Sequence, residues 1–134
     1  MANYKDLIAW QKSMQLVEEV YKLVKLLPKE ETHALSDQMR RAAVSIPSNL
    51  AEGHGRDSAK EFARFISISQ GSRAELETQL EICTRLNYLS EQQLQAAFGL
   101  CMEIEKILRG LSRKLSTSNS ELRTNNCATK RSTP

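Results

Sequence analysis

The sequence predicts an all-α fold: an antiparallel up-down-up-down four-helix bundle with a disordered C-terminal tail. Apolar residues recur at spacings of three and four along four segments, and only eight of the 134 residues are Gly or Pro. The connections between these segments are short, which favours antiparallel neighbours. We therefore expect one domain, a four-helix bundle over residues 1–115, followed by a flexible polar tail over residues 116–134.

The first helix is predicted between residues 7 and 27. Asp6 precedes the periodic run and is the expected N-cap, and Pro28 ends the helix. Apolar residues at spacings of three and four share one helical face. These residues are Leu7, Trp10, Met14, Val17, Tyr21 and Val24.

The second helix is predicted to start between Thr32 and Ser36 and to end at Gly53, a residue type that favours helix C-termini. Pro47 lies inside it, lacks a backbone donor and crowds the preceding turn, so a kink is expected. Asn49 follows closely and is expected to bond a carbonyl that Pro47 leaves free. The apolar stripe of this helix is Leu35, Met39, Ala42, Ala43, Ile46 and Leu50.

Two adjacent arginines on this helix, Arg40 and Arg41, point about 100° apart and cannot serve the same contact. We expect one of them to pair with a carboxylate of the third helix, such as Glu75 or Glu77. The other is expected to face solvent or a neighbouring subunit.

Capping boxes mark the starts of the last two helices, where Ser58 precedes Glu61 and Ser90 precedes Gln93 by three residues. The third helix carries a stripe with small residues at its middle, which allows close approach of a neighbour. That stripe is Phe62, Phe65, Ile66, Ser69, Ser72, Leu76, Leu80, Cys83 and Leu86. The fourth keeps a strict seven-residue repeat of Leu94, Ala97, Cys101, Ile104, Leu108, Leu111 and Leu115.

Charge is predicted to gather at one end of the bundle, although the net charge is only +3. The topology brings together the start of the first helix, the turn between the second and third, and the end of the fourth with the tail. This end has five more basic than acidic residues, and the remainder has two more acidic than basic. Its cations either complement helix dipoles and aid solubility, or bind nucleic-acid phosphates. The residues predicted for phosphate binding are Arg56, Lys60, Arg64, Lys106, Arg109, Arg113 and Lys114.

No motif of a common catalytic or metal site is found. The sequence has no Walker-type phosphate loop, no H-E-x-x-H and no G-x-S-x-G, and the Glu30 and His33 pair is one copy of a spacing that di-iron bundles need twice. Cys83 and Cys101 lie on apolar stripes, where thiols are inert. We therefore expect a protein that is not an enzyme and needs no cofactor or metal. No apolar run reaches the roughly 20 residues of a membrane span, which predicts a cytoplasmic protein.

Two blocks of the sequence carry a family resemblance: DLIAWQKSMQLVEEVYKLVKLLP and QMRRAAVSIPSNLAEGHGRDSAKEFARFISISQGSRAELETQL. The chain resembles, over about residues 4 to 89, a bacterial family of four-helix-bundle proteins encoded by intervening sequences within the large-subunit ribosomal RNA gene. The resemblance implies a small antiparallel bundle that assembles into a homopentamer. Residues that match the pattern, with structural or interface roles implied, are Arg40, Arg41, Asn49, Glu52 and Gly53.

The same family is similar in architecture to the accessory variability determinant of diversity-generating retroelements, a basic pentamer that binds nucleic acid and reverse transcriptase. Our leading hypothesis is a non-enzymatic homo-oligomer that binds RNA or DNA non-specifically through its basic end. The alternative is a protein-interaction scaffold or an accessory factor for a reverse transcriptase, with the partner docking on exposed Trp10 or Tyr21.

Overall fold

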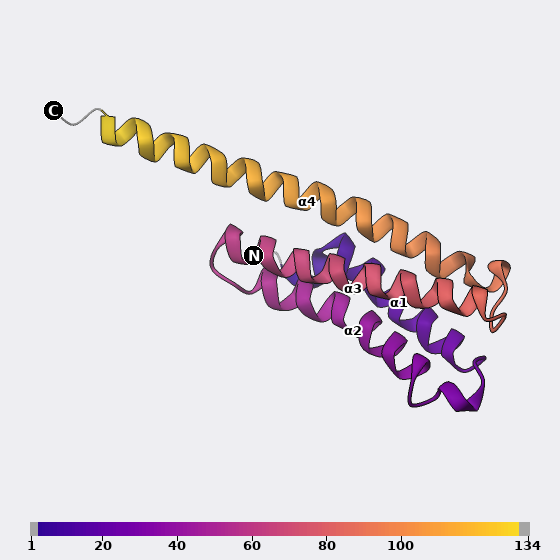
Figure 1. The fold of residues 1–134 in the computed structure, drawn as a ribbon. Coiled ribbons are helices and arrows are strands. Elements are labelled where there is room, and N and C mark those ends of the chain that lie inside the picture. The colour runs from indigo at the N-terminus through magenta and orange to yellow at the C-terminus, as the bar shows by residue number, and fades with distance from the viewer. Residues whose placement is uncertain (1–2, 132–134) are drawn as a thin grey trace.

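The computed structural model describes residues 3–131 of the chain, with side chains described through residue 117. Within these residues four α-helices and two short 3-10 helices form, without a strand (Figure 1). The predicted all-α fold is confirmed. The elements are η1 (Tyr4–Asp6), α1 (Ile8–Val24), η2 (Lys29–Glu31), α2 (Leu35–His54), α3 (Ala59–Arg85) and α4 (Glu91–Arg131).

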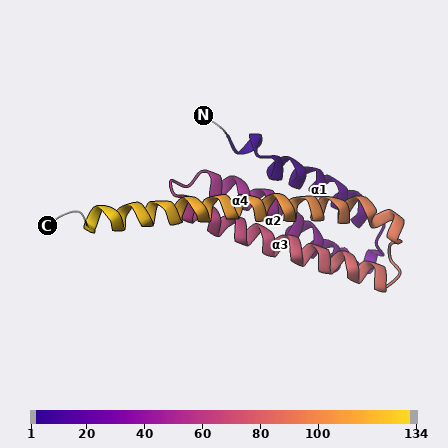
Figure 2. The same cartoon turned by 90° about the horizontal axis from the view of Figure 1, so that it is seen from above.

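The four helices form a closed, four-sided bundle. Helices α1 and α3 each pack on both α2 and α4, and neither diagonal pair makes contact within the described residues. Figure 2 shows the helices running side by side with their connections at the two ends. This arrangement buries one stripe of each helix in a single core. The predicted up-down-up-down topology is therefore confirmed.

The core face of α1 is not the apolar stripe that the sequence spacing identifies. Of that stripe only Val24 is buried, whereas Met14 and Tyr21 are 38% and 43% exposed. The core stripe lies about 100° around the helix from it, because it is offset by one residue. Both stripes have helical spacing, so periodicity alone does not distinguish them. The buried residues of α1 are Ala9, Ser13, Leu16, Val20, Leu23 and Val24.

The start of α1 also corrects the predicted cap. Asn3 and Asp6 form a reciprocal capping box around η1, with the Asn3 side chain accepting from the Lys5 amide at 2.7 Å. Leu7 is the N-cap of α1 and offers no side-chain bond. Asp6 therefore caps the preceding turn and not the helix. At the other end, α1 stops before Pro28, as predicted.

Helix α2 continues through Pro47, and polar side chains bond two backbone carbonyls just before that residue. Asn49 donates to the carbonyl of Ser45 at 2.8 Å and to the Ser45 hydroxyl at 2.9 Å. The sequence predicts that Asn49 bonds a carbonyl that Pro47 leaves free, which in an α-helix is the carbonyl of Ala43, four residues before the proline. Asn49 bonds the Ser45 carbonyl instead. The kink stays a prediction.

Close contact between α2 and α3 depends on small residues. The hydroxyls of Ser45 and Ser72 lie 2.8 Å apart, and the buried Ser69 donates to the Ile46 carbonyl at 3.0 Å. Nearer the turn, a Cβ atom built on the buried Gly53 would collide with the side chain of Phe65. Gly53 is therefore part of the packed seam, and the α2 C-cap is the next glycine, Gly55.

The predicted caps and stripes of the last two helices are largely confirmed. The Ser58 hydroxyl accepts from the Glu61 amide at 3.1 Å, and Ser90 and Gln93 make both bonds of a capping box. The heptad stripe of α4 is buried from Leu94 to Leu108. Leu86 is the exception on α3, because it is the C-cap of the helix and is exposed.

The backbone of α4 stays helical beyond the predicted boundary at Leu115. The backbone of α4 runs Glu91–Arg131, and its C-terminal part projects past the other helices in Figures 1 and 2. No Gly or Pro interrupts residues 111–133, and adding a residue to an existing helix is easier than starting one. Residues 132–134 and the side chains beyond residue 117 lie outside the described part. The domain boundary at residue 115 stays a prediction.

The seam between α2 and α3 gives a direct test of the packing. Gly53→Ala should destabilise the protein by about 1 to 3 kcal/mol, because the added methyl group forces Phe65 and the helix backbone apart. Gly71→Ala is the matched control: a Cβ there meets nothing within 4 Å, and replacing a helical glycine should add about 0.5 to 1 kcal/mol. Urea unfolding, followed by circular dichroism, measures the free energy of unfolding of both variants. Equal stability of the two variants would contradict the close packing of α2 against α3 at Gly53.

Candidate nucleic-acid interface

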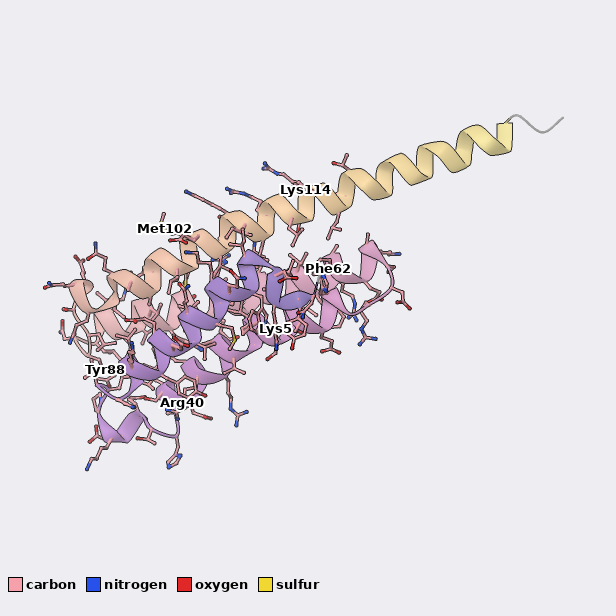
Figure 3. The ribbon with its side chains drawn as sticks, turned by 180° about the vertical axis from the view of Figure 1, so that it is seen from behind. Lys5, Arg40, Phe62, Tyr88, Met102 and Lys114 are labelled. Atoms are coloured by element: carbon pink, nitrogen blue, oxygen red, sulfur yellow. The ribbon has the colours of Figure 1, made fainter. Side chains whose placement is uncertain are left out.

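Three distant segments meet at one end of the bundle, which we call the basic end: the start of α1, the α2–α3 turn and residues 103–117 of α4. Figure 3 places Lys5, Phe62 and Lys114 together at this end. The side-chain amide of Gln70 donates to the Glu105 carbonyl at 3.1 Å and ties α3 to α4. The predicted convergence of these segments is therefore present.

Two arginines of the predicted site frame an aromatic ring at the α2–α3 turn. Arg56 pairs with Glu52 at 2.9 Å and Arg64 with Glu61 at 3.1 Å. Their guanidinium groups lie 5.3 and 4.8 Å from the centroid of the Phe65 ring, within the range of cation–π attraction. The family-pattern residue Glu52 therefore orients Arg56 at this turn.

Two more cations of the basic end are paired across or along helices. Arg109 lies 3.3 Å from Glu105, one turn earlier on α4. Lys12 of α1 bonds Glu103 of α4 at 3.0 Å. The charges of these cations are partly offset by their neighbours.

Four of the predicted phosphate-binding residues remain unpaired among the described side chains: Lys60, Lys106, Arg113 and Lys114. No carboxylate lies within 4 Å of any of them in that part of the chain, and all four are exposed. Lys106 and Arg113 are seven residues apart, so they share the outer face of α4 about 10 Å from each other. Arg109 lies between them.

The length of α4 bears on one of the two explanations of these cations, the stabilisation of a helix dipole. Dipole stabilisation falls off within the last turn of a helix. Lys114 lies more than four turns, about 25 Å, before the end of α4 at Arg131. Lys106, Arg113 and Lys114 therefore gain nothing from the helix C-terminus.

Arg40 and Arg41 do not pair with α3 as predicted. Arg41 lies 3.0 Å from Asp37 of its own helix, and Arg40 lies 4.0 Å from the same carboxylate. The predicted partner Glu77 instead bonds Arg73, one turn away on α3, at 2.7 Å. Carboxylates three or four residues away on the same helix are already within reach, so less side-chain order is needed than for a contact across helices.

A hollow surface between α1 and α2 was missed by the sequence analysis. It consists of two adjoining hollows of about 340 and 380 Å³ that share Val44. The sequence signal was the apolar stripe of the first helix, because most residues of this stripe line the outer surface. The residues that define the hollows include Trp10, Met14, Val17, Pro47, Tyr21 and Arg41.

Neither described cysteine is suited to nucleophilic chemistry. Burial, with a smaller contribution from Glu31, raises the pKa of Cys83 to about 11. Burial also raises the pKa of Cys101 to about 12. No group of three or more potential metal-binding His, Cys, Asp or Glu side chains occurs in the searched part of the chain. Within the same part, no helix is long and apolar enough to cross a membrane.

The sequence matches the family described as 23S rRNA-intervening sequence protein over residues 5–110. The chain belongs to this family. A crystal structure of a protein with unknown function from the S23 ribosomal protein family of Bacteroides thetaiotaomicron is similar, with a TM-score of 0.72 and 25% sequence identity. The match covers 78% of this chain and 98% of that one. No curated protein matches the sequence.

Thiol reactivity tests the burial of the core. In the folded protein at pH 8, Cys83 and Cys101 should resist iodoacetamide and then react fully in guanidinium chloride, as read by peptide mass spectrometry. Because their pKa values lie above the ordinary 9.0, the unfolded state loses protons first, and stability should fall as pH rises above about 9. Rapid alkylation of either residue in the native protein would contradict this packing.

Proposed function

We propose that this family member is a non-enzymatic homo-oligomer, a pentamer in the cytoplasm, that binds RNA or DNA through its basic end without sequence preference. The observation that carries the proposal is the group of cations without ion-pair partners among the described side chains. Lys106, Arg113 and Lys114 are exposed on α4, well before its end, and Lys60 is exposed on the first turn of α3.

Unpaired exposed cations favour polyanion binding for a simple electrostatic reason. A phosphate backbone releases condensed counterions when lysine and arginine replace them, and this gain needs no particular base sequence. On α4, Lys106 and Arg113 lie on the same face. Among the described residues, neither cation pairs with a carboxylate, and both are too far from the C-terminus of α4 to interact with the helix dipole. Phosphate contact is the interaction that suits such groups best.

The paired arginines can also contact phosphates at the basic end, because breaking their exposed ion pairs costs little free energy. Exposed ion pairs contribute only about 0 to 1 kcal/mol, so a phosphate can displace the carboxylate partner. Arg56, Arg64 and Arg109 are about half exposed or more, and their partners are one turn away on the same stretch of chain. We therefore assign them a secondary role in binding.

The aromatic residues of this end support binding that ignores base identity. Tyr4 and Trp10 pack edge to face with ring centroids 5.5 Å apart, and Trp10 is half-buried. His54 and Phe62 form a second edge-to-face pair with ring centroids 5.6 Å apart, and Phe65 is only 6% exposed. Sequence-tolerant stacking of bases needs free aromatic faces in a row, and these packed rings do not provide them. Phosphate contacts are expected to dominate.

Assembly would multiply these weak contacts. Copies related by one symmetry axis present their basic ends together, and linked weak sites bind with greater avidity than one site.

A second candidate function, a scaffold for a protein partner such as a reverse transcriptase, is favoured by the exposed Tyr21 and by the hollows between α1 and α2.

Salt-dependent binding tests the main proposal. Replacing Lys106, Arg113 and Lys114 together by Gln should weaken binding to unrelated RNA and DNA oligonucleotides and lower the slope of log affinity against log salt by about 1 per lost phosphate contact. Fluorescence anisotropy over a salt series measures both. Thermal stability should change little, since all three side chains are exposed.

The matched control removes the same charge from the other end of the bundle, by replacing Lys22, Lys25 and Arg85 with Gln. All three are exposed there. This variant should keep most of the affinity and the wild-type salt slope. An equal loss of nucleic-acid affinity in both variants would show that binding depends on net charge and not on the basic end, which contradicts the proposal. The absence of nucleic-acid binding by the wild-type protein at low salt would also overturn it.

A further inference from the structure

Two outward-facing surfaces of the bundle are lined by apolar side chains that are partly or largely exposed. The first, which we call the α1/α2 groove, joins the two hollows that meet at Val44. Its floor and walls near η1 are apolar, with Trp10, Met14 and Pro47, and its other end carries Arg40 and Arg41. The groove therefore changes from apolar to charged along its length.

The second surface, which we call the α4 outer stripe, consists of Glu91, Gln95, Phe98 and Met102 at spacings of four, three and four. Met102 is 59% exposed, among the highest values for a large apolar side chain in the described residues. Gly99 has open space where a Cβ would be, so a shallow depression lies between the two large side chains. One end of the stripe is acidic and the other apolar.

The two surfaces match in length and in charge order. From Arg41 to Ala51 the groove follows α2 for about 15 Å, and from Glu91 to Met102 the stripe runs about 16 Å. When Met102 lies in the apolar end of the groove, Glu91 reaches its basic end. Arg41 has a side chain 80% exposed, and Glu91 has no ion-pair partner among the described residues.

We propose that the α1/α2 groove of one copy receives the α4 outer stripe of a second copy of this chain. The contact is an apolar helix in a groove, closed at one end by pairing between Glu91 and the Arg40 and Arg41 pair. The two arginines share only one carboxylate, Asp37, so they retain a positive charge for Glu91. This inference rests on the homo-oligomer in the proposed function and names its contact surfaces.

The positions of the two surfaces set the kind of assembly. Figure 3 shows Met102 and Arg40 on opposite sides of the bundle, and α2 and α4 make no contact with each other. Each copy therefore offers its groove to one neighbour and its stripe to another. Such a head-to-tail contact makes a closed ring when the rotation closes, rather than a two-fold dimer.

The same helix then connects assembly to nucleic-acid binding. Beyond Met102 the outer face of α4 continues with Lys106, Arg109 and Arg113 at spacings of four, three and four. The apolar part of this face lies in the interface, and the basic part begins one turn later. In a ring, rotational symmetry places every basic part on the same side.

Single substitutions at exposed apolar residues test the contact without disturbing the core. Met102→Glu and Val44→Glu should each convert the assembly to monomers in size-exclusion chromatography with light scattering. Leu26→Glu is the matched control, because Leu26 is 57% exposed but lies in neither surface, and it should keep the wild-type mass. Unchanged circular dichroism shows that each variant folds.

A charge exchange tests the register. Arg41→Glu and Glu91→Arg should each lower the assembled fraction at least tenfold at low salt, and the double variant should recover most of it. Recovery distinguishes a direct pair from a general effect of charge.

The outcomes separate this inference from the proposed function. A wild-type assembly that persists in Met102→Glu and Val44→Glu, or a double variant without recovery, overturns the groove and stripe contact but leaves assembly itself standing. A monomeric wild type overturns the contact and the proposed oligomer together. Nucleic-acid binding is measured separately by the salt series, so its loss or survival does not decide the contact.

Discussion

The close approach of α2 and α3 is the constraint on which the rest of the structure depends. Side chains are minimal along this seam: Gly53 lies against Phe65, and serine hydroxyls bond between the helices. A buried hydroxyl needs a partner, and the Ile46 carbonyl beside Pro47 supplies one for Ser69. The seam fixes the α2–α3 turn and so holds Phe65 where two arginines can flank it. The family-pattern residues Gly53 and Glu52 are therefore understood as parts of one packed turn, which is a structural role that presents charge at the surface.

The surface of the bundle depends on the length of α4 and on the two opposite faces of this helix. The heptad stripe is buried in the core. The outer face is acidic at Glu91, apolar at Phe98 and Met102, and basic beyond Met102. Because the helix runs on to Arg131, its central cations are remote from the C-terminal carbonyls that would otherwise attract them. The same helix can therefore take part in an assembly contact and in phosphate binding, with the two functions on successive turns.

Local ion pairs decide which cations are available. Most salt bridges in the described residues join side chains three or four positions apart in the chain, including those of Arg56, Arg64 and Arg109. Such pairs are weak in water, yet they outcompete longer contacts because the partners are already adjacent. This explains why Arg40 and Arg41 share Asp37 rather than reaching α3, and why an exposed positive charge remains beside the α1/α2 groove.

The sequence by itself determined the number and order of the helices, the caps at Ser58 and Ser90, and the core stripes of α2, α3 and α4, because these depend on spacing within one segment. It also located the segments that converge at the basic end. Only the tertiary structure decided which of two apolar faces of α1 enters the core. Both faces have helical spacing, and the buried one is the face that packs against α2 and α4. The tertiary structure likewise decided which cations are paired. An ion pair depends on the distance between two side chains, and the sequence spacing gives that distance only for residues of the same helix.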